Sequence, residues 1–525
     1  MDTGKVSDEQ KNFAVSFEKI VVEIYSLLDA CSSRVLLASS TVNPRHPLPN
    51  DHAKLIAFET EGKDYQSYPQ AGFGKKLKRF IISLLFAARE TLHILYVRLV
   101  HASRIRSLYK EKVQIVIKTW YFYAKKEAVS NFYYGNLAPL LEQEGIQTMI
   151  VGGNLGKSSI MHFSNGMLAP HRRSVPEKAL LPFWAPGKVL IDQLRTYWQL
   201  RKLVVKNRNS LFSTVATEAA FECLSLNTLA NALHYYIAKR AVEKWHPKAY
   251  ATLYEGQPWE KLAWLGVKTA SKECLTIGYQ HTIIMSYSWG LIKPSAGSAG
   301  FTTPDVVLTL GNIPQKLMED GQVGFNTKFI TLGSFRRKAE TGAEPIKYPQ
   351  PSQQKVLVVP EGFLSEATIL FDRAAQLAVL LPDHHFIFRS HPFLPFKNVQ
   401  PFLSVNISSI LNIELSTNVA IEDDFARASC LLYRGSSVVL YGILNGLKPW
   451  YLNEPGLAFV DPLFALTTWR ETAGSVSELA ASMKEYSLSD AVSANNEWLP
   501  AKTYVEEYSK PIQEAAIQEL ASVLN

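Results

Sequence analysis

Two short polar segments in the second half of the chain carry side chains that bind phosphate. The first, residues 389–392 (Arg-Ser-His-Pro), follows the apolar run 385–388, and the second, residues 433–437 (Tyr-Arg-Gly-Ser-Ser), follows the run 428–432. Arginine and histidine donate hydrogen bonds to phosphate oxygens, and hydroxyls at a helix start can do the same. Strand ends in open α/β sheets bind phosphorylated ligands, so we expect a nucleotide-phosphate site here. The predicted nucleotide-binding residues are Arg389, His391, Pro392, Arg434, Gly435, Ser436 and Ser437.

Each segment also has an ordinary structural interpretation. A histidine followed by Pro392 is typical of a solvated loop in which the proline stops the strand. Serine is a common N-cap, so Ser436 or Ser437 at the start of the predicted helix 437–446 would satisfy backbone N–H groups without a ligand. The two segments together favour phosphate binding, because both fall in the same predicted domain.

A second set of reactive side chains lies in the first half of the chain. Glu255 follows the predicted strand 249–254 and precedes the predicted helix 259–270, and His281 follows the next strand, 275–279. A carboxylate at this edge can take the proton of an acceptor hydroxyl, with His281 as its partner. The alternative is a carboxylate that only stabilises the helix dipole. The predicted catalytic residues are Glu255 and His281, and the predicted substrate contacts are Gly256, Gln280 and Glu361.

The order of elements predicts two doubly wound α/β domains. Apolar runs alternate with helical periodicity, which is typical of parallel sheets. Predicted strands cover residues 34–38, 113–117, 147–151, 249–254, 275–279, 305–310, 328–332, 355–359, 385–388, 428–432 and 449–452. Predicted helices cover 12–30, 74–108, 136–144, 259–270, 365–381, 437–446 and 503–524, and residues 178–245 are mostly helical.

The domain boundaries follow from these elements. We expect a Rossmann-like N-terminal domain at 1–335, with helical insertions at 74–108 and 178–245, and a linker at 336–352 that is rich in charge and proline. A C-terminal Rossmann-like domain follows at 353–502, and the helix at 503–525 is free to cross back to the first domain. The cleft between two such domains is a common place for a ligand.

Composition is consistent with a folded cytoplasmic protein. The 525 residues exceed what a single hydrophobic core supports, and 47% hydrophobic with 19% charged residues is ordinary for a globular chain. The net charge of +8 fits a nucleic acid, an anionic membrane or a phosphate-bearing substrate, and it equally fits a basic protein with no such partner. The four widely separated cysteines indicate buried, reduced thiols. The first 11 residues do not resemble a signal peptide, and the apolar run 80–88 is too short to span a bilayer.

The predicted helix 74–108 alternates apolar stretches with lysine and arginine. Lys75, Lys76, Lys78 and Arg79 lie at its start, and further arginines lie toward its end. Interfacial helices have this pattern, which predicts peripheral contact with a membrane. The alternative is an amphipathic helix packed on its own domain with a solvated basic face.

Five segments together carry a family resemblance. Residues 253–261 (LYEGQPWEK), 276–282 (TIGYQHT), 304–311 (PDVVLTLG), 389–392 (RSHP) and 433–452 (YRGSSVVLYGILNGLKPWYL) resemble bacterial surface-carbohydrate biosynthesis proteins. These look like GT-B glycosyltransferases that build capsule and lipopolysaccharide, and the matches run through most of residues 110–455.

The His-Pro and Ser-Ser elements also resemble those of bacterial sialyltransferases, polysialyltransferases and capsule Kdo transferases, which hold the CMP part of the donor. The resemblance implies that His391 and Ser436 or Ser437 contact the nucleotide phosphate. Sialyltransferases keep two acids before a glycine at the catalytic base, and here Tyr254 replaces the first of them.

The resemblance implies a GT-B glycosyltransferase that moves a CMP-activated acidic sugar, such as Kdo or a sialic-acid-like sugar, onto a lipopolysaccharide O antigen or capsule. Its location would be the cytoplasm, at the inner face of the membrane, with a nucleotide-sugar donor, a glycan or lipid-linked glycan acceptor and no nucleic acid. No metal or other cofactor is expected, because no Asp-x-Asp cluster follows a predicted strand. The alternatives are a polyol-phosphate or NDP-hexose transferase on the same fold, or an inactive glycan-binding GT-B module.

Overall fold

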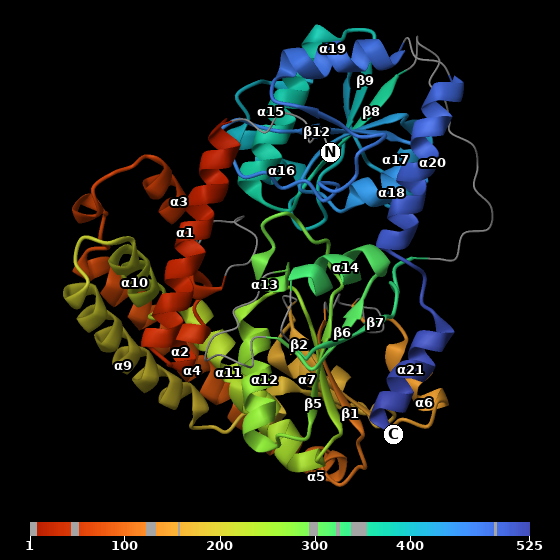
Figure 1. Ribbon diagram of the computed structural model, residues 1–525. Helices are drawn as coiled ribbons and strands as arrows, with labels where there is room; N and C mark the ends of the chain where they lie inside the picture. Colours follow the sequence, from red (N-terminus) through yellow and green to blue (C-terminus); the bar gives the residue numbers. More distant parts are fainter. Residues whose placement is uncertain are drawn as a thin grey trace. The chain divides into compact units, whose positions relative to one another are not determined.

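The computed structural model describes residues 8–43, 52–121, 133–155, 158–292, 303–321, 326–337, 354–487 and 491–525. The chain forms two compact units (Figure 1). The N-terminal unit contains Ala14–His281, Ser288–Lys338 and Lys510–Asn525. The C-terminal unit contains Ala339–Ser509 together with Met1–Phe13 and Thr282–Tyr287.

The N-terminal unit is built on a seven-stranded sheet in which every neighbouring pair of strands is parallel. Nearly all residues of its central strands are buried, because helices cover both faces of such a sheet. Across the sheet the strands are β3 (Ser174–Pro176), β2 (Thr148–Asn154), β1 (Ile115–Tyr121), β4 (Ala249–Leu253), β5 (Leu275–Tyr279), β6 (Val306–Thr309) and β7 (Lys328–Thr331).

Helices form layers on both faces of this sheet. On one face, α6 (Leu137–Gln143) and α21 (Glu514–Leu524) share a hydrophobic core with the strands, and α11 (Leu226–Trp245) and α12 (Pro258–Ala270) lie on the other face (Figure 1). Further helices in or reaching into this unit are α1 (Asp8–Ala30), α2 (Arg34–Leu37), α3 (Ala53–Thr60), α4 (Phe73–Val100), α5 (Ala102–Leu108), α7 (Ile160–Met167), α8 (Glu177–Leu180), α9 (Ala185–Lys206), α10 (Leu211–Glu222), α13 (Trp289–Ile292) and α14 (Asn312–Gly321).

The C-terminal unit is built on a six-stranded sheet that is also parallel throughout. Across it the strands are β10 (Ile413–Leu415), β9 (His385–Phe388), β8 (Lys355–Pro360), β11 (Cys430–Arg434), β12 (Lys448–Leu452) and β13 (Glu471–Ala473). The helices α15 (Leu364–Leu380), α16 (Phe396–Val399) and α19 (Val476–Ser487) lie on one side, and α17 (Ile421–Arg427), α18 (Val438–Leu444) and α20 (Ala491–Tyr508) on the other (Figure 1). The predicted fold class, two doubly wound Rossmann-like sheets, is therefore confirmed.

Three predicted elements differ in the structure. The predicted strand 34–38 is instead helix α2. A short apolar run has no periodicity that distinguishes a helix from a strand, so packing against α9 and α11 determines its conformation. The predicted helix 74–108 is interrupted at His101, where the backbone leaves helical geometry between α4 and α5. The predicted helix 503–524 is two helices, because α20 ends at Tyr508 and α21 starts at Glu514.

Two further expectations concern the linker and the cysteines. Residues 338–352 of the predicted linker lie outside the described residues. All four cysteines are buried and none forms a disulfide, as the sequence predicted.

Candidate active site

The two sheets place the predicted polar residues at the points where strand order reverses. In the N-terminal unit, the chain moves from β1 to β2 and β3 on one side and then returns to β4 on the other side of β1. In the C-terminal unit, it moves from β8 to β9 and β10 and returns to β11. Ligands of open α/β sheets bind outside the carboxyl ends of the strands at such a switch point. Glu255 follows β4, Glu361 follows β8, and Gly435 follows β11.

Glu255 and His281 meet at the carboxyl edge of the N-terminal sheet. Leu253 of β4 pairs in register with Tyr279 of β5, so the side chains two residues beyond each strand occupy equivalent positions. Nε2 of His281 lies 2.6 Å from Oε1 of Glu255, and the two side chains are 5% and 17% exposed. The predicted pairing of these two residues is therefore confirmed.

The surroundings hold the Glu255 carboxylate in one orientation. Nε2 of Gln257 donates a hydrogen bond of 3.1 Å to Oε2 of Glu255, so both carboxylate oxygens have contacts. The ring of Tyr133 lies edge-to-face on His281 at 4.9 Å, and burial followed by the charge of Glu255 raises the pKa of Tyr133 to about 12. A carboxylate that contacts one imidazole nitrogen can take a proton itself or orient the ring as a base.

Glu260 fixes the loop that carries Glu255. Its carboxylate is fully buried and accepts hydrogen bonds from the backbone N–H groups of Glu255, Gly256 and Gln257, each at 3.0 Å. These N–H groups lie in the turn that leads into α12, and negative charge is favourable near the start of a helix. Gly256 has φ +77°, a conformation that favours glycine. The conformation of this loop therefore depends on Gly256 as well as on Glu260. Predicted as a substrate contact, Gly256 lies in this loop beside Glu255.

Gln280 has a structural position. The residue is fully buried, and its Oε1 accepts a hydrogen bond of 3.2 Å from the backbone N–H of Leu310. Its own backbone N–H donates to the carbonyl of Leu308 at 2.9 Å. These contacts tie the end of β5 to β6, and the structure gives Gln280 this role in place of the predicted substrate contact.

In the C-terminal unit, two glycines bring three strand-end loops together. A Cβ on Gly362, after β8, would lie 2.9 Å from Nδ1 of His391, after β9. A Cβ on Gly435, after β11, would lie 2.6 Å from Oε2 of Glu361. The predicted residues His391, Glu361 and Gly435 therefore lie at one edge of the sheet.

His391 presents a hydrogen-bond donor at this edge. The backbone N–H of Phe393 donates a hydrogen bond of 3.2 Å to Nδ1, and burial lowers the pKa of the imidazole. A neutral ring with Nδ1 as acceptor carries its proton on Nε2. The described residues supply no acceptor for this Nε2–H. Pro392 follows in an exposed position at the turn.

The two serines differ in exposure. Ser436 is 6% exposed, whereas Ser437 is exposed and occupies the N-cap position of α18. The side chain of Ser437 makes no capping hydrogen bond, so capping by this hydroxyl, the structural alternative, is not observed.

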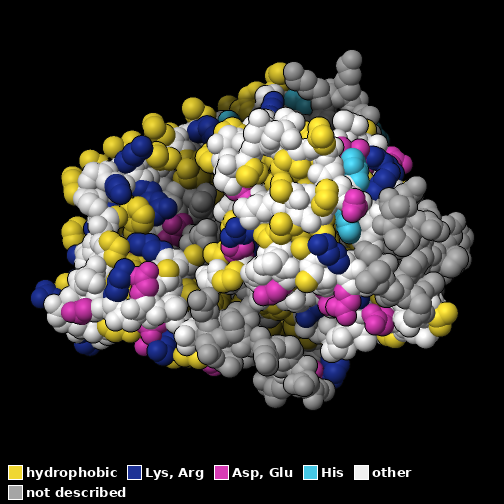
Figure 2. Space-filling model, turned by 90° about the horizontal axis from the view of Figure 1, so that it is seen from above, with side chains coloured by type: hydrophobic (Ala, Val, Ile, Leu, Met, Phe, Trp, Pro, Cys, Tyr) yellow, Lys and Arg dark blue, Asp and Glu magenta, His cyan; other side chains and the backbone are white. Residues whose placement is uncertain are grey.

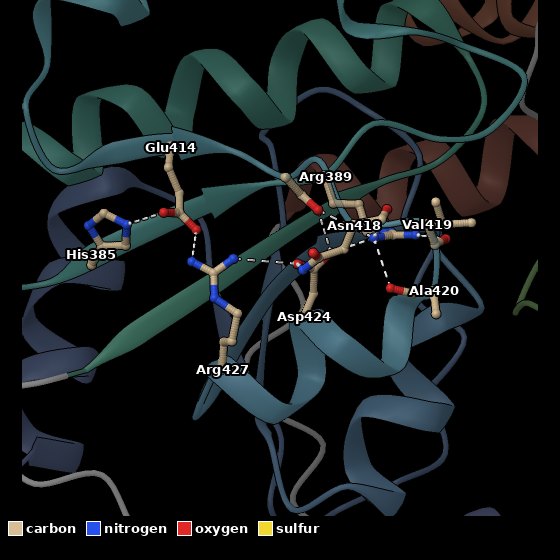
Figure 3. A network of polar contacts seen from close by, with 9 residues as sticks. His385, Arg389, Glu414, Asn418, Val419, Ala420, Asp424 and Arg427 are labelled. Carbon is tan, nitrogen blue, oxygen red and sulfur yellow. Dashed lines mark hydrogen bonds and ion pairs between the residues drawn. The ribbon is translucent and has the colours of Figure 1, made fainter.

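Arg389 is held inside a polar network (Figure 3). Its guanidinium pairs with the fully buried carboxylate of Asp424 and donates to the carbonyls of Asn418 at 3.1 Å and Val419 at 3.0 Å. Asp424 also accepts from the hydroxyl of Ser416 at 2.6 Å. The structure therefore gives Arg389 the role of fixing the loop before α17, and the predicted contact with a nucleotide is not supported.

Arg434 is fully buried beneath the site. Its Nε contacts Glu366 at 2.5 Å, and its terminal nitrogens donate to the hydroxyl of Tyr451 at 3.2 Å and to the carbonyls of Leu452 at 3.1 Å and Ala458 at 2.8 Å. With every guanidinium nitrogen engaged, Arg434 positions the end of β11. Its predicted contact with a nucleotide is corrected accordingly.

Sequence reasoning missed the residues that support this site. Glu366 and Asp424 neutralise the two arginines, and Gly362 leaves space for His391. The spacing Gln257-x-x-Glu260 at the start of α12 is the one local signal, because it matches a capping box. Among the described residues, no group of three or more His, Cys, Asp or Glu side chains could hold a metal ion.

Comparison with known proteins gives similarity in structure alone. No protein-family model matches the chain, and no curated protein matches it significantly. The glycotransferase of kitacinnamycin is similar with a TM-score of 0.44 and 12% identity, over 79% of this chain and 100% of that one. The glycosyltransferase SnogD from Streptomyces nogalater has a TM-score of 0.41 at 12% identity, over 78% and 100%. The UDP-GlcNAc 2-epimerase from Neisseria meningitidis bound to UDP-GlcNAc has a TM-score of 0.39 at 10% identity, over 78% and 99%.

Proposed function

We propose that this protein is a glycosyltransferase of the GT-B plan that moves a sugar from a nucleotide donor to a surface glycan. The observation that carries the proposal is the placement of both candidate residue sets at the switch points of two doubly wound sheets. One set offers an acid–base pair, Glu255 with His281. The other offers hydrogen-bond donors around His391 that suit phosphate oxygens.

The C-terminal unit is the proposed nucleotide site. Nε2–H of His391 is a donor at the sheet edge, and the Ser436 and Ser437 hydroxyls follow the neighbouring strand β11. Neutral donors of this kind suit a phosphate in a partly buried site, because they satisfy its oxygens at little desolvation cost. The proposed donor is CMP-linked and carries an acidic sugar such as Kdo or a sialic-acid-like sugar.

The N-terminal unit is the proposed acceptor side. Glu255 takes the proton of the acceptor hydroxyl as it attacks the anomeric carbon, and His281 holds the carboxylate through the 2.6 Å contact. The nucleotide phosphate leaves with the electrons of the bond to the sugar. The proposal includes no metal or other cofactor.

The proposed place of the reaction is the cytoplasmic side of the membrane, with a lipopolysaccharide O antigen or capsule chain, free or lipid-linked, as acceptor. This proposal rests on the resemblance of the sequence segments and on the charge of the chain.

A nucleotide screen by thermal shift tests the proposal. A nucleotide that binds the folded protein raises its apparent stability, so CMP is expected to raise Tm more than UDP, GDP or CDP. His391→Ala should weaken CMP binding by about 1.5–3 kcal/mol, the range for a hydrogen bond to a charged group. His171→Ala, an exposed histidine in the other unit, is the matched control.

Each other outcome of the screen contradicts part of the proposal. A shift with CDP alone would indicate a polyol-phosphate donor, and a shift with UDP or GDP alone would indicate an NDP-hexose. No shift in Tm with any nucleotide would favour the remaining alternative, an inactive glycan-binding module. CMP binding that is unchanged in His391→Ala would move the site away from β9.

A further inference from the structure

Helices α4 and α9 lie side by side and antiparallel in the N-terminal unit, where they pack directly on one another. At one end, Arg201 near the end of α9 donates a hydrogen bond of 3.3 Å to Gln70, which precedes α4. At the other end, Arg98 of α4 lines a cavity of about 300 Å³ together with Phe183 and Trp184 at the start of α9. The two helices therefore form one platform, the α4/α9 face.

The solvent side of α4 is apolar over six turns. Side chains recur every three or four residues, which places them on one face of a helix. Their exposed fractions range from 38% at Leu95 to 76% at Leu99 for the large side chains. The stripe spans about 33 Å at 1.5 Å per residue. Its members are Leu77, Ile81, Leu84, Ala88, Leu92, Leu95 and Leu99.

The opposite side of α4 is fixed to the protein. Ser83 donates a hydrogen bond of 2.8 Å to the carbonyl of Leu224, Arg79 pairs with Glu222 at 3.0 Å, and buried Glu90 pairs with Lys178. By length and composition α4 is the one helix among the described residues that could cross a membrane, so the apolar stretch is longer than the run 80–88 suggested. These polar contacts hold α4 on the domain surface with its apolar stripe turned outward.

Helix α9 continues the same surface. Its exposed apolar side chains recur along one face and include two tryptophans, Trp184 at 51% and Trp198 at 63% exposure. Figure 2 shows hydrophobic and basic side chains mixed over the left part of the face that it presents. The exposed members are Trp184, Ile191, Leu194, Trp198 and Val205.

The charge on both helices is strongly positive. Helix α4 contains six lysines and arginines and one acidic residue, the buried Glu90, so its net charge is +5. Helix α9 contains five lysines and arginines and one acidic residue, Asp192, so its net charge is +4. Arg195 and Lys202 flank the α9 stripe and, with Arg34, line a cavity of about 590 Å³. Asp192 in that cavity is already paired with Lys188 at 2.5 Å.

We propose that the α4/α9 face docks on an anionic lipid bilayer and lies in its interface. Exposed leucine, isoleucine and tryptophan would enter the boundary between headgroups and acyl chains, and the flanking lysine and arginine side chains would contact lipid phosphates. Charge favours a bilayer over a second copy of the chain. Two copies would bring the lysine and arginine side chains of both α4/α9 faces together, and these would repel one another. Spanning is disfavoured by the contacts of Glu90 and Ser83 with the rest of the unit.

Flotation with vesicles tests the proposal on the full chain, without nucleotide, so its outcome is independent of the proposed reaction. The protein is expected to float with phosphatidylglycerol-containing vesicles, to bind pure phosphatidylcholine more weakly, and to be released by alkaline carbonate. The triple variant Leu84→Gln, Leu92→Gln and Leu99→Gln should lose binding on the order of a hundredfold. These side chains are exposed by 49%, 66% and 76%, so their replacement spares the core.

The matched control replaces equally exposed apolar side chains of α15 and of the loop before β10. Val379→Gln, Leu380→Gln and Leu411→Gln, exposed by 65%, 49% and 99%, should float like the unmodified protein. Arg195→Gln with Lys202→Gln should reduce the preference for phosphatidylglycerol while weak binding to phosphatidylcholine persists.

Three results would overturn the proposal. One is a protein that stays in solution with anionic vesicles at low salt. Another is a dimer without lipid that the α4 triple variant converts to monomer in sedimentation experiments, which would assign the face to a second copy of this chain. The third is binding that resists carbonate, which would contradict an interfacial position.

Discussion

Gly435 and Glu361 are packed so closely that a Cβ on the glycine would lie 2.6 Å from Oε2 of the carboxylate. Gly435 also has φ +71°, a conformation that other residues adopt only at a cost. The loops after β8 and β11 therefore depend on this glycine for two reasons, backbone conformation and contact. Because these loops flank the switch point, their spacing sets the shape of the proposed nucleotide site.

Gly435→Ala is expected to weaken nucleotide binding and to destabilise the C-terminal unit. Gly456→Ala is the matched control, because Gly456 has a similar φ of +75° with no atom within 4 Å of a built Cβ. In Gly456→Ala the free energy of unfolding should fall only by the backbone strain of alanine at this φ, about 1 kcal/mol. Urea unfolding and CMP titration of both variants separate the effect of backbone strain from that of the close contact with Glu361. Equal losses of stability and of CMP affinity in the two variants would show that the contact with Glu361 is unimportant.

Glu255→Gln is expected to lower turnover on the order of a hundredfold or more, the scale of general acid–base catalysis. The amide keeps the shape, so folding and nucleotide binding should stay nearly intact. Release of nucleotide from the sugar donor with acceptor present measures turnover. Glu273→Gln, an exposed acid before β5, is the control. Near-normal turnover in Glu255→Gln would assign the carboxylate to the structure of the loop and leave His281 as the base to test.

Strand ends could be predicted from the sequence because the signals are local. Buried strands of a parallel sheet read as continuous apolar runs, and the polar residue after each run marks the carboxyl edge. Glu255, His281 and His391 were found in this way. The pairing of Glu255 with His281 followed as soon as β4 and β5 were taken as neighbours.

Other features depend on partners that are distant in the sequence. Arg389 follows β9 and Arg434 is the last residue of β11, so both lie at strand ends just as His391 does. Asp424 and Glu366, which lie 35 and 68 residues away, hold their guanidinium groups inside the fold. No local pattern separates a ligand-binding arginine from one that is neutralised by a buried acid. The short run Val35, Leu36 and Leu37 became a helix for a similar reason, since packing on α9 and α11 decided between two conformations that fit it equally.

Arg434→Met is expected to destabilise the C-terminal unit by about 3–5 kcal/mol, because it leaves the buried Glu366 without its partner. The double variant Arg434→Met with Glu366→Leu should recover much of this loss, since apolar side chains of similar size can replace a buried ion pair. Chemical denaturation measures both. CMP affinity near normal in the double variant would agree with a structural Arg434, and a large loss of affinity in a stable double variant would restore the predicted nucleotide contact.

His234 should make the N-terminal unit sensitive to acid. Its ring is 6% exposed and lies 5.5 Å from Trp120 and 5.0 Å from Trp259. Burial, and then the positive charge of Lys118, lower its pKa from the ordinary 6.5 to about 3, although Glu177 partly offsets the effect. Between these two values the unfolded chain binds a proton that the folded chain does not. Stability is therefore fully present above pH 6.5 and falls as the pH drops toward 3.

His234→Phe keeps a ring of similar size and removes this titration. Below pH 6.5, the unmodified protein should lose stability more steeply than the variant, with a difference in slope of up to about 1.4 kcal/mol per pH unit. Urea unfolding followed by circular dichroism at several pH values measures the slope, and His171→Phe, at an exposed position, is the control. Every other titratable group is present in both proteins, so the difference isolates His234. Parallel stability curves would show that His234 is protonated in the folded state with an ordinary pKa.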